Sequence, residues 1–176
     1  MITTERLVLR QWQDSDLEPW AELNADPEVM RHFPAVQSRL ESDAMAAGNR
    51  AYIDQHGFGL WAVERRVDAV FLGFVGLKAL ADSNPLAPAV EAGWRLARHG
   101  WGQGYATEAA TAAMADGFGR LGLERIVAFT AVSNLSSQAV MQRSGMTRRA
   151  DLDFDHPALP AGHRLSRHLV WERLES

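Results

Sequence analysis

The sequence predicts a three-layer α/β domain built on one mixed sheet. Strand-like and helix-like segments follow one another in the order strand, helices, three strands, helix, strand, helix, strands. Strands without an intervening helix favour antiparallel hairpins, whereas strands separated by a helix favour crossover connections. The chain has 176 residues, 47% of them hydrophobic, with no repeat or low-complexity linker. That length can bury one hydrophobic core, so a single domain over residues 1–176 is expected.

The first half of the chain predicts one strand followed by helices. Asp14 or Ser15 can cap the first helix, Ser38 or Ser42 can cap a longer one, and Gly57 lies where that longer helix breaks. A short helical turn begins at the Asp-Pro-Glu triplet between the two helices. The strand and the helical segments are therefore expected at residues 7–12, 14–24, 26–28 and 38–55.

The second half predicts most of the sheet. Gly73 and Gly76 interrupt one strand and indicate bending or a close approach of another backbone. Gly122 is a suitable residue to end an alanine-rich helix, and Asn134 or Ser136 can cap the next helix, which Gly145 ends. The strands are expected at 60–64, 70–80, 89–97, 125–132 and about 168–171, and the helices at 103–121 and 134–144.

The composition excludes several classes of function. The net charge is −4 with mixed signs, and the Arg65–Arg66 and Arg148–Arg149 pairs are flanked by acids, so no nucleic-acid partner is expected. There is no cysteine, which excludes disulfides, thiolate-bound zinc and a cysteine acyl-enzyme. No His, Asp and Glu set has metal-ligand spacing, so no metal is expected. The chain starts without a signal peptide and has no apolar run of roughly 18 residues, which predicts a cytoplasmic protein without a membrane partner.

A glycine-dense turn between a strand and a helix is the most informative stretch. It reads Trp101-Gly102-Gln103-Gly104-Tyr105-Ala106-Thr107-Glu108-Ala109. The start of a helix leaves backbone N–H groups unpaired, and glycines let an anion approach them, which predicts a pyrophosphate cradle. The Lys-Ser/Thr pair of a Walker loop is absent, and Thr107 stands where a dinucleotide-binding loop needs Gly or Ala. A turn that is glycine-rich for structural reasons alone is the alternative.

The pattern G-x-G-x-A at Gly102, Gly104 and Ala106 resembles motif A of the GNAT acetyltransferases. It is especially similar to the branch that includes the ribosomal-protein N-terminal acetyltransferases RimJ and RimL. His99 departs mildly from the Gln or Arg that usually opens this motif. The resemblance implies the GNAT fold, with a mixed, mostly antiparallel sheet of six or seven strands flanked by about four helices.

Asn134, followed eleven residues later by Gly145 and Met146, resembles motif B of the same family. The opening at residues 4–10 and the segment at 168–171 extend the resemblance over essentially the whole chain. In the family this Asn contacts the pantetheine arm of coenzyme A or orders the turn. Capping of a helix alone is the other interpretation of Asn134.

The resemblance implies acetyl-CoA as co-substrate. In GNAT folds the strand before the turn splays from its neighbour near a bulge, which frees backbone groups for the acetyl carbonyl and the pantetheine amides. Residues of this strand, of the turn and of motif B are expected to bind the co-substrate: Trp94, Arg95, Leu96, Ala97, His99, Gly100, Gly102, Gln103, Gly104, Tyr105, Ala106, Thr107, Asn134 and Ser137.

The family joins acetyl-CoA and an amine in one complex, and the amine attacks the thioester without an acyl-enzyme. Glu91 is the candidate base, acting directly or through a water, with a solvent-facing carboxylate as the alternative. Glu108 fits a structural role at a helix start better than a catalytic one. Met141 replaces the tyrosine that many members use as acid, so Ser137 is expected either to assist the leaving thiol or only to bind coenzyme A. His156 could line the acceptor site or act as base, against the interpretation of a simple loop histidine.

The acceptor site is expected between the first two helices, the loop near Phe58 and the segment 151–163. Five aromatic residues could form its walls, although most of them should belong to the core: Trp12, Trp20, Phe33, Phe58 and Trp61.

The identity of the acceptor is less constrained than its place. A protein N-terminal α-amine, with a pKa near 8, suits a modest base better than lysine, with a pKa of about 10.4. A small-molecule amine (amino acid, polyamine or antibiotic) and a non-catalytic acyl-CoA sensor are the alternatives. Acyl length and oligomeric state, including a homodimer, are left open.

Overall fold

One sheet forms the centre of the molecule. The computed structural model describes residues 1–160 and 162–175. Within these residues, nine strands follow the order β1-β2-β3-β4-β5-β6-β9-β7, with β8 paired to β9. Only the β5–β6 pair is parallel among the described pairs. The strands are β1 (Ile2–Thr3), β2 (Leu7–Arg10), β3 (Leu60–Arg65), β4 (Val70–Ala79), β5 (Val90–Leu96), β6 (Arg125–Ala131), β7 (Thr147–Arg148), β8 (Phe154–Asp155) and β9 (Arg167–Leu174).

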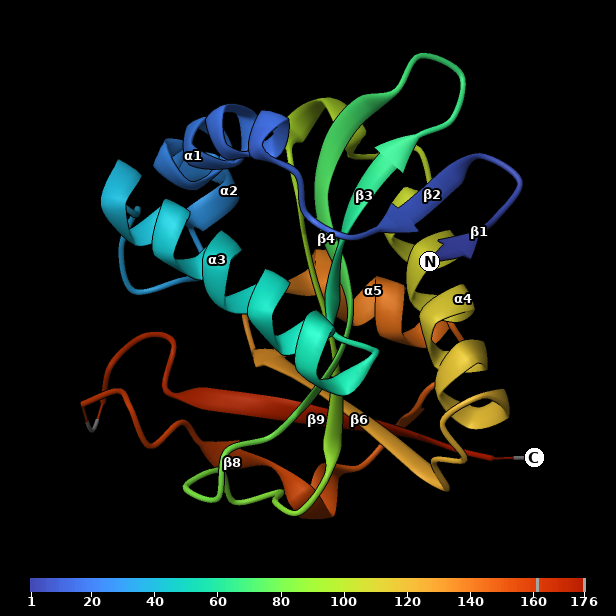
Figure 1. Ribbon diagram of the computed structural model, residues 1–176. Helices are drawn as coiled ribbons and strands as arrows, with labels where there is room; N and C mark the ends of the chain where they lie inside the picture. The colour runs from blue at the N-terminus through green and yellow to red at the C-terminus, as the bar shows by residue number, and fades with distance from the viewer. Residues whose placement is uncertain (161, 176) are drawn as a thin grey trace.

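Five α-helices and three short 3-10 helices surround this sheet in the described residues (Figure 1). No described helix is long and apolar enough to cross a membrane. The α-helices are α1 (Leu17–Ala25), α2 (Pro27–Met30), α3 (Arg39–His56), α4 (Tyr105–Gly119) and α5 (Leu135–Arg143), and the 3-10 helices are η1 (Asp14–Asp16), η2 (Arg98–Gly100) and η3 (Ala150–Leu152).

The helices lie on both faces of the sheet, as side chains of adjacent strand residues show. Successive residues of a strand point to opposite faces. Trp94 of β5 donates a hydrogen bond to Ser137 of α5, whereas Arg95 donates one to Asn24 of α1. In β4, Lys78 lies over the ring of Tyr52 in α3. The α1–α3 helices therefore cover one face and α5 the other, which gives the predicted three layers.

The sheet opens between its two parallel strands. β5 and β6 pair only at Val90 with Ile126 and at Glu91 with Val127, although both strands continue beyond this point. In Figure 1, β6 and β9 cross the lower part of the molecule at a large angle to β3 and β4. The predicted splay is thus present. The bulge lies elsewhere, at Val63 and Glu64 of β3, where the register with β4 shifts.

Two glycines of β4 permit close backbone approach, as the sequence predicts. A Cβ atom at Gly73 would lie 2.1 Å from the carbonyl oxygen of Arg95, and one at Gly76 would lie 2.0 Å from that of Gly59. Larger residues at these positions would push β5 or the segment before β3 away. Gly73 therefore allows β5, the strand with several candidate site residues, to lie close to β4, and Gly76 does the same for the segment before β3.

The predicted fold class is confirmed, while several details differ. The sheet has nine strands instead of six or seven because β1, β7 and β8 are pairs of residues too short to produce a periodic pattern. α4 begins at Tyr105 and not at Gln103, because Gly104, with φ of 78°, is its N-cap. Gly122 does not end this helix, whose C-cap is Arg120, although Gly122 has a φ of 65° in the following turn.

Candidate functional site

A cavity of about 920 Å³ reaches both faces of the sheet where β5 and β6 separate. One side is formed by the glycine-dense turn and the first turns of α4 and α5. The other side is formed by α2 with the loop after it, by α3, and by residues before and within β9. The cavity thus connects the predicted cradle with the predicted acceptor region.

The glycine-dense turn presents open backbone amides to this cavity. Gly102 and Gly104 have φ angles of 72° and 78°, which favour glycine, and Gly104 caps α4 without a side-chain hydrogen bond. The N–H groups of the first helical turn have no intrahelical partner, and the first bond of this kind runs from Glu108 N to Gly104 O. These donors, together with the positive end of the α4 dipole, form a site suited to an anion.

The N-terminal segment fixes this turn in place. Arg6 donates from Nη1 to the carbonyl oxygen of Gln103 at 2.9 Å and from Nε to Glu108 at 2.6 Å. Thr4 Oγ1 donates to the same carboxylate at 2.6 Å. Burial raises the pKa of Glu108, but these hydrogen bonds and the charge of Arg6 outweigh it and lower the pKa overall. Glu108 is therefore a structural residue that ties α4 to the start of the chain, as its position at a helix start predicts.

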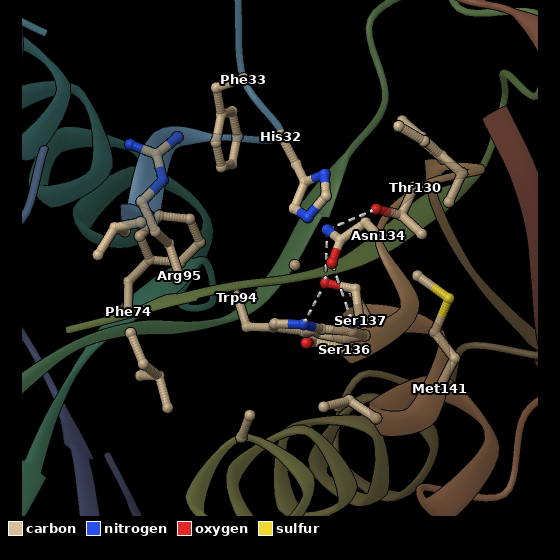
Figure 2. Close-up of a pocket in the computed structure, with 18 of the residues that line it drawn as sticks. His32, Phe33, Phe74, Trp94, Arg95, Thr130, Asn134, Ser136, Ser137 and Met141 are labelled. Atoms are coloured by element: carbon tan, nitrogen blue, oxygen red, sulfur yellow. Dashed lines mark hydrogen bonds between the residues drawn. The ribbon is translucent and has the colours of Figure 1, made fainter. Parts of the chain in front are cut away.

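Four polar side chains form a network at the start of α5 (Figure 2). Asn134 Oδ1 accepts a hydrogen bond from Ser137 N at 3.2 Å and so caps the helix. Its Nδ2 donates to Thr130 Oγ1 at 2.9 Å and to Ser137 Oγ at 3.0 Å. Trp94 Nε1 also donates to Ser137 Oγ, at 3.3 Å. Because Ser137 Oγ accepts both bonds, its own hydroxyl hydrogen is available for a group in the cavity.

Glu91 lies on the opposite face of β5 from Trp94 and lines the same cavity. It stands beside Lys78 in the β4–β5 register. Burial raises the pKa of Glu91 to about 7, while the charge of Lys78 acts in the other direction. A carboxylate with a pKa close to neutrality can both accept and release a proton at physiological pH.

Most of the predicted site residues line one cavity. Three of them do not: Ala97 and His99 border a separate, smaller pocket, and the Gln103 carbonyl is bound to Arg6. His99 Nε2 lies 3.3 Å from the carbonyl oxygen of Phe71. The predicted residues that line the cavity are Glu91, Trp94, Arg95, Leu96, Gly100, Gly102, Gly104, Tyr105, Ala106, Thr107, Asn134 and Ser137.

The five aromatic residues proposed for the acceptor side divide between the cavity and the core, as expected. Phe33 lines the cavity, but Trp12, Trp20 and Trp61 belong to the hydrophobic core, and Phe58 packs against that core. Most of these aromatic rings were expected in the core, and Trp12 and Trp20 pack against each other there with ring centroids 5.3 Å apart. Within the predicted segment 151–163, His156 lines the cavity, and residue 161 lies outside the described residues.

Sequence reasoning missed several groups that the fold brings to the cavity. His168 of β9 lies 5.0 Å from His156 between ring centroids. Burial lowers the pKa of both imidazoles, which favours their neutral forms. Lys78 and Asn49 also line the cavity, and Asn49 Nδ2 is buried without a hydrogen-bond partner. No local motif marks these residues, because three distant segments contribute them.

Met141 occupies the tyrosine position of motif B and lines the cavity with 2% of its surface exposed. Its thioether has no proton to donate. Ser137, one turn earlier in α5, is the hydroxyl group of this helix that also contacts Trp94. Ser137 is therefore the residue of this network whose hydroxyl group can donate a hydrogen bond from α5 into the cavity.

Comparison with known proteins agrees with this architecture. Residues 6–147 match the acetyltransferase (GNAT) domain. The chain is 30% identical to the uncharacterized N-acetyltransferase YnaD of Bacillus subtilis (strain 168) over 162 residues, which cover 92% of this chain and 89% of YnaD. A GNAT-family acetyltransferase structure from Bacillus anthracis aligns with a TM-score of 0.81 and 24% identity over 98% of this chain and 97% of that chain.

A ribosomal-protein acetyltransferase is also among the structural neighbours. The enzyme from Salmonella typhimurium that modifies the N-terminal serine of ribosomal protein L7/L12 aligns with a TM-score of 0.78 and 19% identity, over 98% of this chain and 97% of that chain. The cradle, the opened strands and the family match lead to one conclusion: the chain belongs to the GNAT family of N-acetyltransferases.

Proposed function

We propose that this chain transfers the acetyl group of acetyl-CoA to a primary amine by direct attack within a ternary complex. One observation carries the proposal: a single cavity contains an open amide cradle at one end and Glu91 on the far side of the β5–β6 opening. The cradle suits the pyrophosphate of coenzyme A, and the opening suits the thioester between the two substrates.

The residues around the opening fit an acetyl-CoA molecule. Backbone N–H groups from Gly102 to Thr107 would hold the pyrophosphate, and the free edge of β5 at Trp94–Leu96 would bind the pantetheine amides and the acetyl oxygen. Asn134 and Ser137 would border the sulfur end of the molecule. Ala97, His99 and Gln103 contribute through the shape of the turn and not through its cavity surface.

The proposed chemistry needs one proton acceptor and one hydrogen-bond donor. The amine nitrogen attacks the thioester carbonyl carbon, forming a C–N bond, and the C–S bond then breaks. Glu91 takes the proton that the amine loses, directly or through a water. The Ser137 hydroxyl donates a hydrogen bond to the departing sulfur. A thiol with a pKa of about 8.5 leaves readily as thiolate, so this help is modest.

An α-amine is the acceptor that the proposed base favours, and a protein N-terminus is the first candidate. Its pKa near 8 lies within reach of a carboxylate whose pKa is about 7. A small-molecule amine is the second candidate. The charges that line the cavity disfavour a polyamine. Among the described lining residues, Glu28 and Glu91 are acidic, whereas the arginine and lysine residues number four: Arg31, Lys78, Arg95 and Arg143.

An acceptor screen tests the proposal. Acetyl-CoA is incubated with short peptides of varied first residue, free amino acids, polyamines and aminoglycosides, and released coenzyme A is measured with a thiol reagent. The absence of cysteine from the chain keeps the background of this assay low. Amine-dependent release with an acetylated product supports the proposal. Binding of acetyl-CoA without release for any amine would instead indicate the acyl-CoA sensor.

A further inference from the structure

Arg95 places a guanidinium group on the acceptor side of the cavity. Figure 2 shows its side chain turned toward Phe33 and away from Trp94. The guanidinium carbon lies 4.1 Å from the centroid of the Phe33 ring and 5.3 Å from that of Trp20. Only 7% of the residue surface is exposed, and the residue lines the cavity. The aromatic rings and Asn24, which accepts from Nη1 at 2.5 Å, hold the group in one orientation.

This buried charge has no acidic partner among residues 1–160 and 162–175. Its one side-chain hydrogen bond runs to the neutral amide of Asn24. Arg10 of the same molecule shows the usual pairing of an arginine with acids, since its guanidinium nitrogens lie 2.8 Å from carboxylate oxygens of both Asp16 and Glu64. Burial lowers the pKa of Arg95 to about 10, which still leaves it charged at neutral pH. A desolvated cation without an anion is costly, so a bound anion would stabilise the charge at this position.

The guanidinium has two nitrogens without a protein acceptor. Nη1 is used by Asn24, and Nε is enclosed and has no hydrogen-bond partner, which leaves Nη2 as the nitrogen that a ligand in the cavity can reach. Nε and Nη2 together form the side of the fork that binds a carboxylate through two parallel hydrogen bonds, so a bidentate contact requires a small shift that uncovers Nε. Asn49 Nδ2, a second buried donor without a partner, lines the same cavity. Both unpartnered atoms are hydrogen-bond donors, and together with the positive charge of Arg95 they favour a ligand with negatively charged acceptor atoms over a cationic one.

We propose that the acceptor is a primary amine that carries a carboxylate, and that Arg95 binds this carboxylate and determines specificity. This inference rests on the proposed function and narrows its substrate. Glu91 and Arg95 lie on the same face of β5, four residues apart, a distance of about 13 Å along a strand. Their side chains can therefore approach the two ends of one small molecule, the amine near Glu91 and the carboxylate at Arg95.

The carboxylate can belong to a free amino acid or to the acidic side chain of a peptide's first residue. Matched acceptors separate these sources: amino acids against their carboxamides, and peptides that begin with Asp or Glu against peptides that begin with Asn or Gln. In at least one series, we expect kcat/KM to fall at least about 30-fold when the carboxylate becomes an amide. Equal rates within both series would overturn the inference.

Arg95 variants test the residue itself. Arg95→Met keeps the bulk and removes the charge, so the KM for the carboxylate acceptor should rise at least about 30-fold. Arg95→Lys should retain part of the preference, because lysine keeps the charge and loses the fork. Arg148→Met is the matched control, since Arg148 also lies over an aromatic ring, that of Trp171, but does not line the cavity.

The outcomes separate this inference from the proposed function. If Arg95→Met folds, acetylates neutral amines as the unaltered chain does, and keeps the same carboxylate preference, Arg95 has only a structural role and the inference is wrong. If Arg95→Met is unfolded by circular dichroism, Arg95→Lys with the matched acceptors decides the question. If no amine releases coenzyme A from the unaltered chain, the proposed function itself fails.

Discussion

Trp94 Nε1 donates a hydrogen bond to Ser137 Oγ at 3.3 Å, and this bond spans the gap that opens between β5 and the helix after β6. Asn134 holds the same oxygen from the other side. The serine is thus fixed by two donors while its hydroxyl hydrogen stays available, an arrangement that suits a hydrogen bond to a developing thiolate.

Ser137→Ala should lower kcat about 10-fold and change the KM for acetyl-CoA little. The hydroxyl assists a leaving group that already departs readily, so the loss is smaller than for a typical general acid. Steady-state kinetics with a saturating amine measure this effect. Ser15→Ala, at an exposed serine in η1, is the control and should match the unaltered chain. A rise in KM with kcat unchanged would assign Ser137 to co-substrate binding only.

The Glu91 carboxylate should give the rate a pH dependence near neutrality. With its pKa raised to about 7 by burial, the carboxylate accepts a proton only above that pH, so kcat should rise as the pH passes from 6 to 8. Glu91→Gln should lower kcat about 100-fold and remove this rise, while acetyl-CoA binds as before. A pH profile of the variant that keeps the rise near 7 would exclude Glu91 as the base.

The same carboxylate should lower stability at high pH. Because its folded-state pKa, about 7, exceeds the unfolded value of 4.5, the folded chain keeps a proton that the unfolded chain has released between these pH values. Stability is therefore lost as the pH rises from 4.5 to 7. Since part of the side chain remains solvated, Glu91→Gln should stabilise the fold by about 2 kcal/mol at pH 8 and not at pH 4. Urea unfolding at the two pH values measures this difference, and an equal effect at both would contradict it.

Arg6 should matter more for co-substrate binding than for stability. Arg6→Met removes the bonds to Gln103 and Glu108, but this ion pair is partly exposed, so the free energy of unfolding should fall by only about 1 kcal/mol. The looser turn should weaken acetyl-CoA binding roughly fivefold. Arg120→Met removes a comparable ion pair at the other end of α4 and should leave acetyl-CoA binding unchanged. Equal binding losses in the two variants would contradict a specific role for Arg6.

Local signals predicted much of this fold. The long helix α3 begins after a capping box formed by Ser38 and Glu41 and ends at Gly57, whose φ is 73°. Both ends were predictable because each signal lies within four residues of the backbone groups that it satisfies. The glycine-dense turn and Asn134 were predictable for the same reason. Two-residue strands such as β8 were not, since their pairing depends on β9 and not on their own sequence.

The candidate site was predictable only in part. Arg95 was expected to serve the co-substrate through its backbone, and the sequence does not reveal that its side chain points to the other face, toward Asn24 and Phe33. The meeting of His156 with His168 depends on β8 pairing beside β9. These contacts join segments that lie far apart in the chain, so no local sequence pattern predicts them.

The central claim is that the amides around Gly102 and Gly104 bind acetyl-CoA. Calorimetric titration of acetyl-CoA into the unaltered chain, Gly104→Val and Gly119→Val tests it most directly. Gly104 has a φ of 78°, which valine rarely adopts, whereas Gly119 is exposed on the same helix with open space around it. We predict clear binding to the unaltered chain and to Gly119→Val, and at least a tenfold loss in a folded Gly104→Val. Absence of binding to the unaltered chain, or equal affinity in all three, would contradict the account.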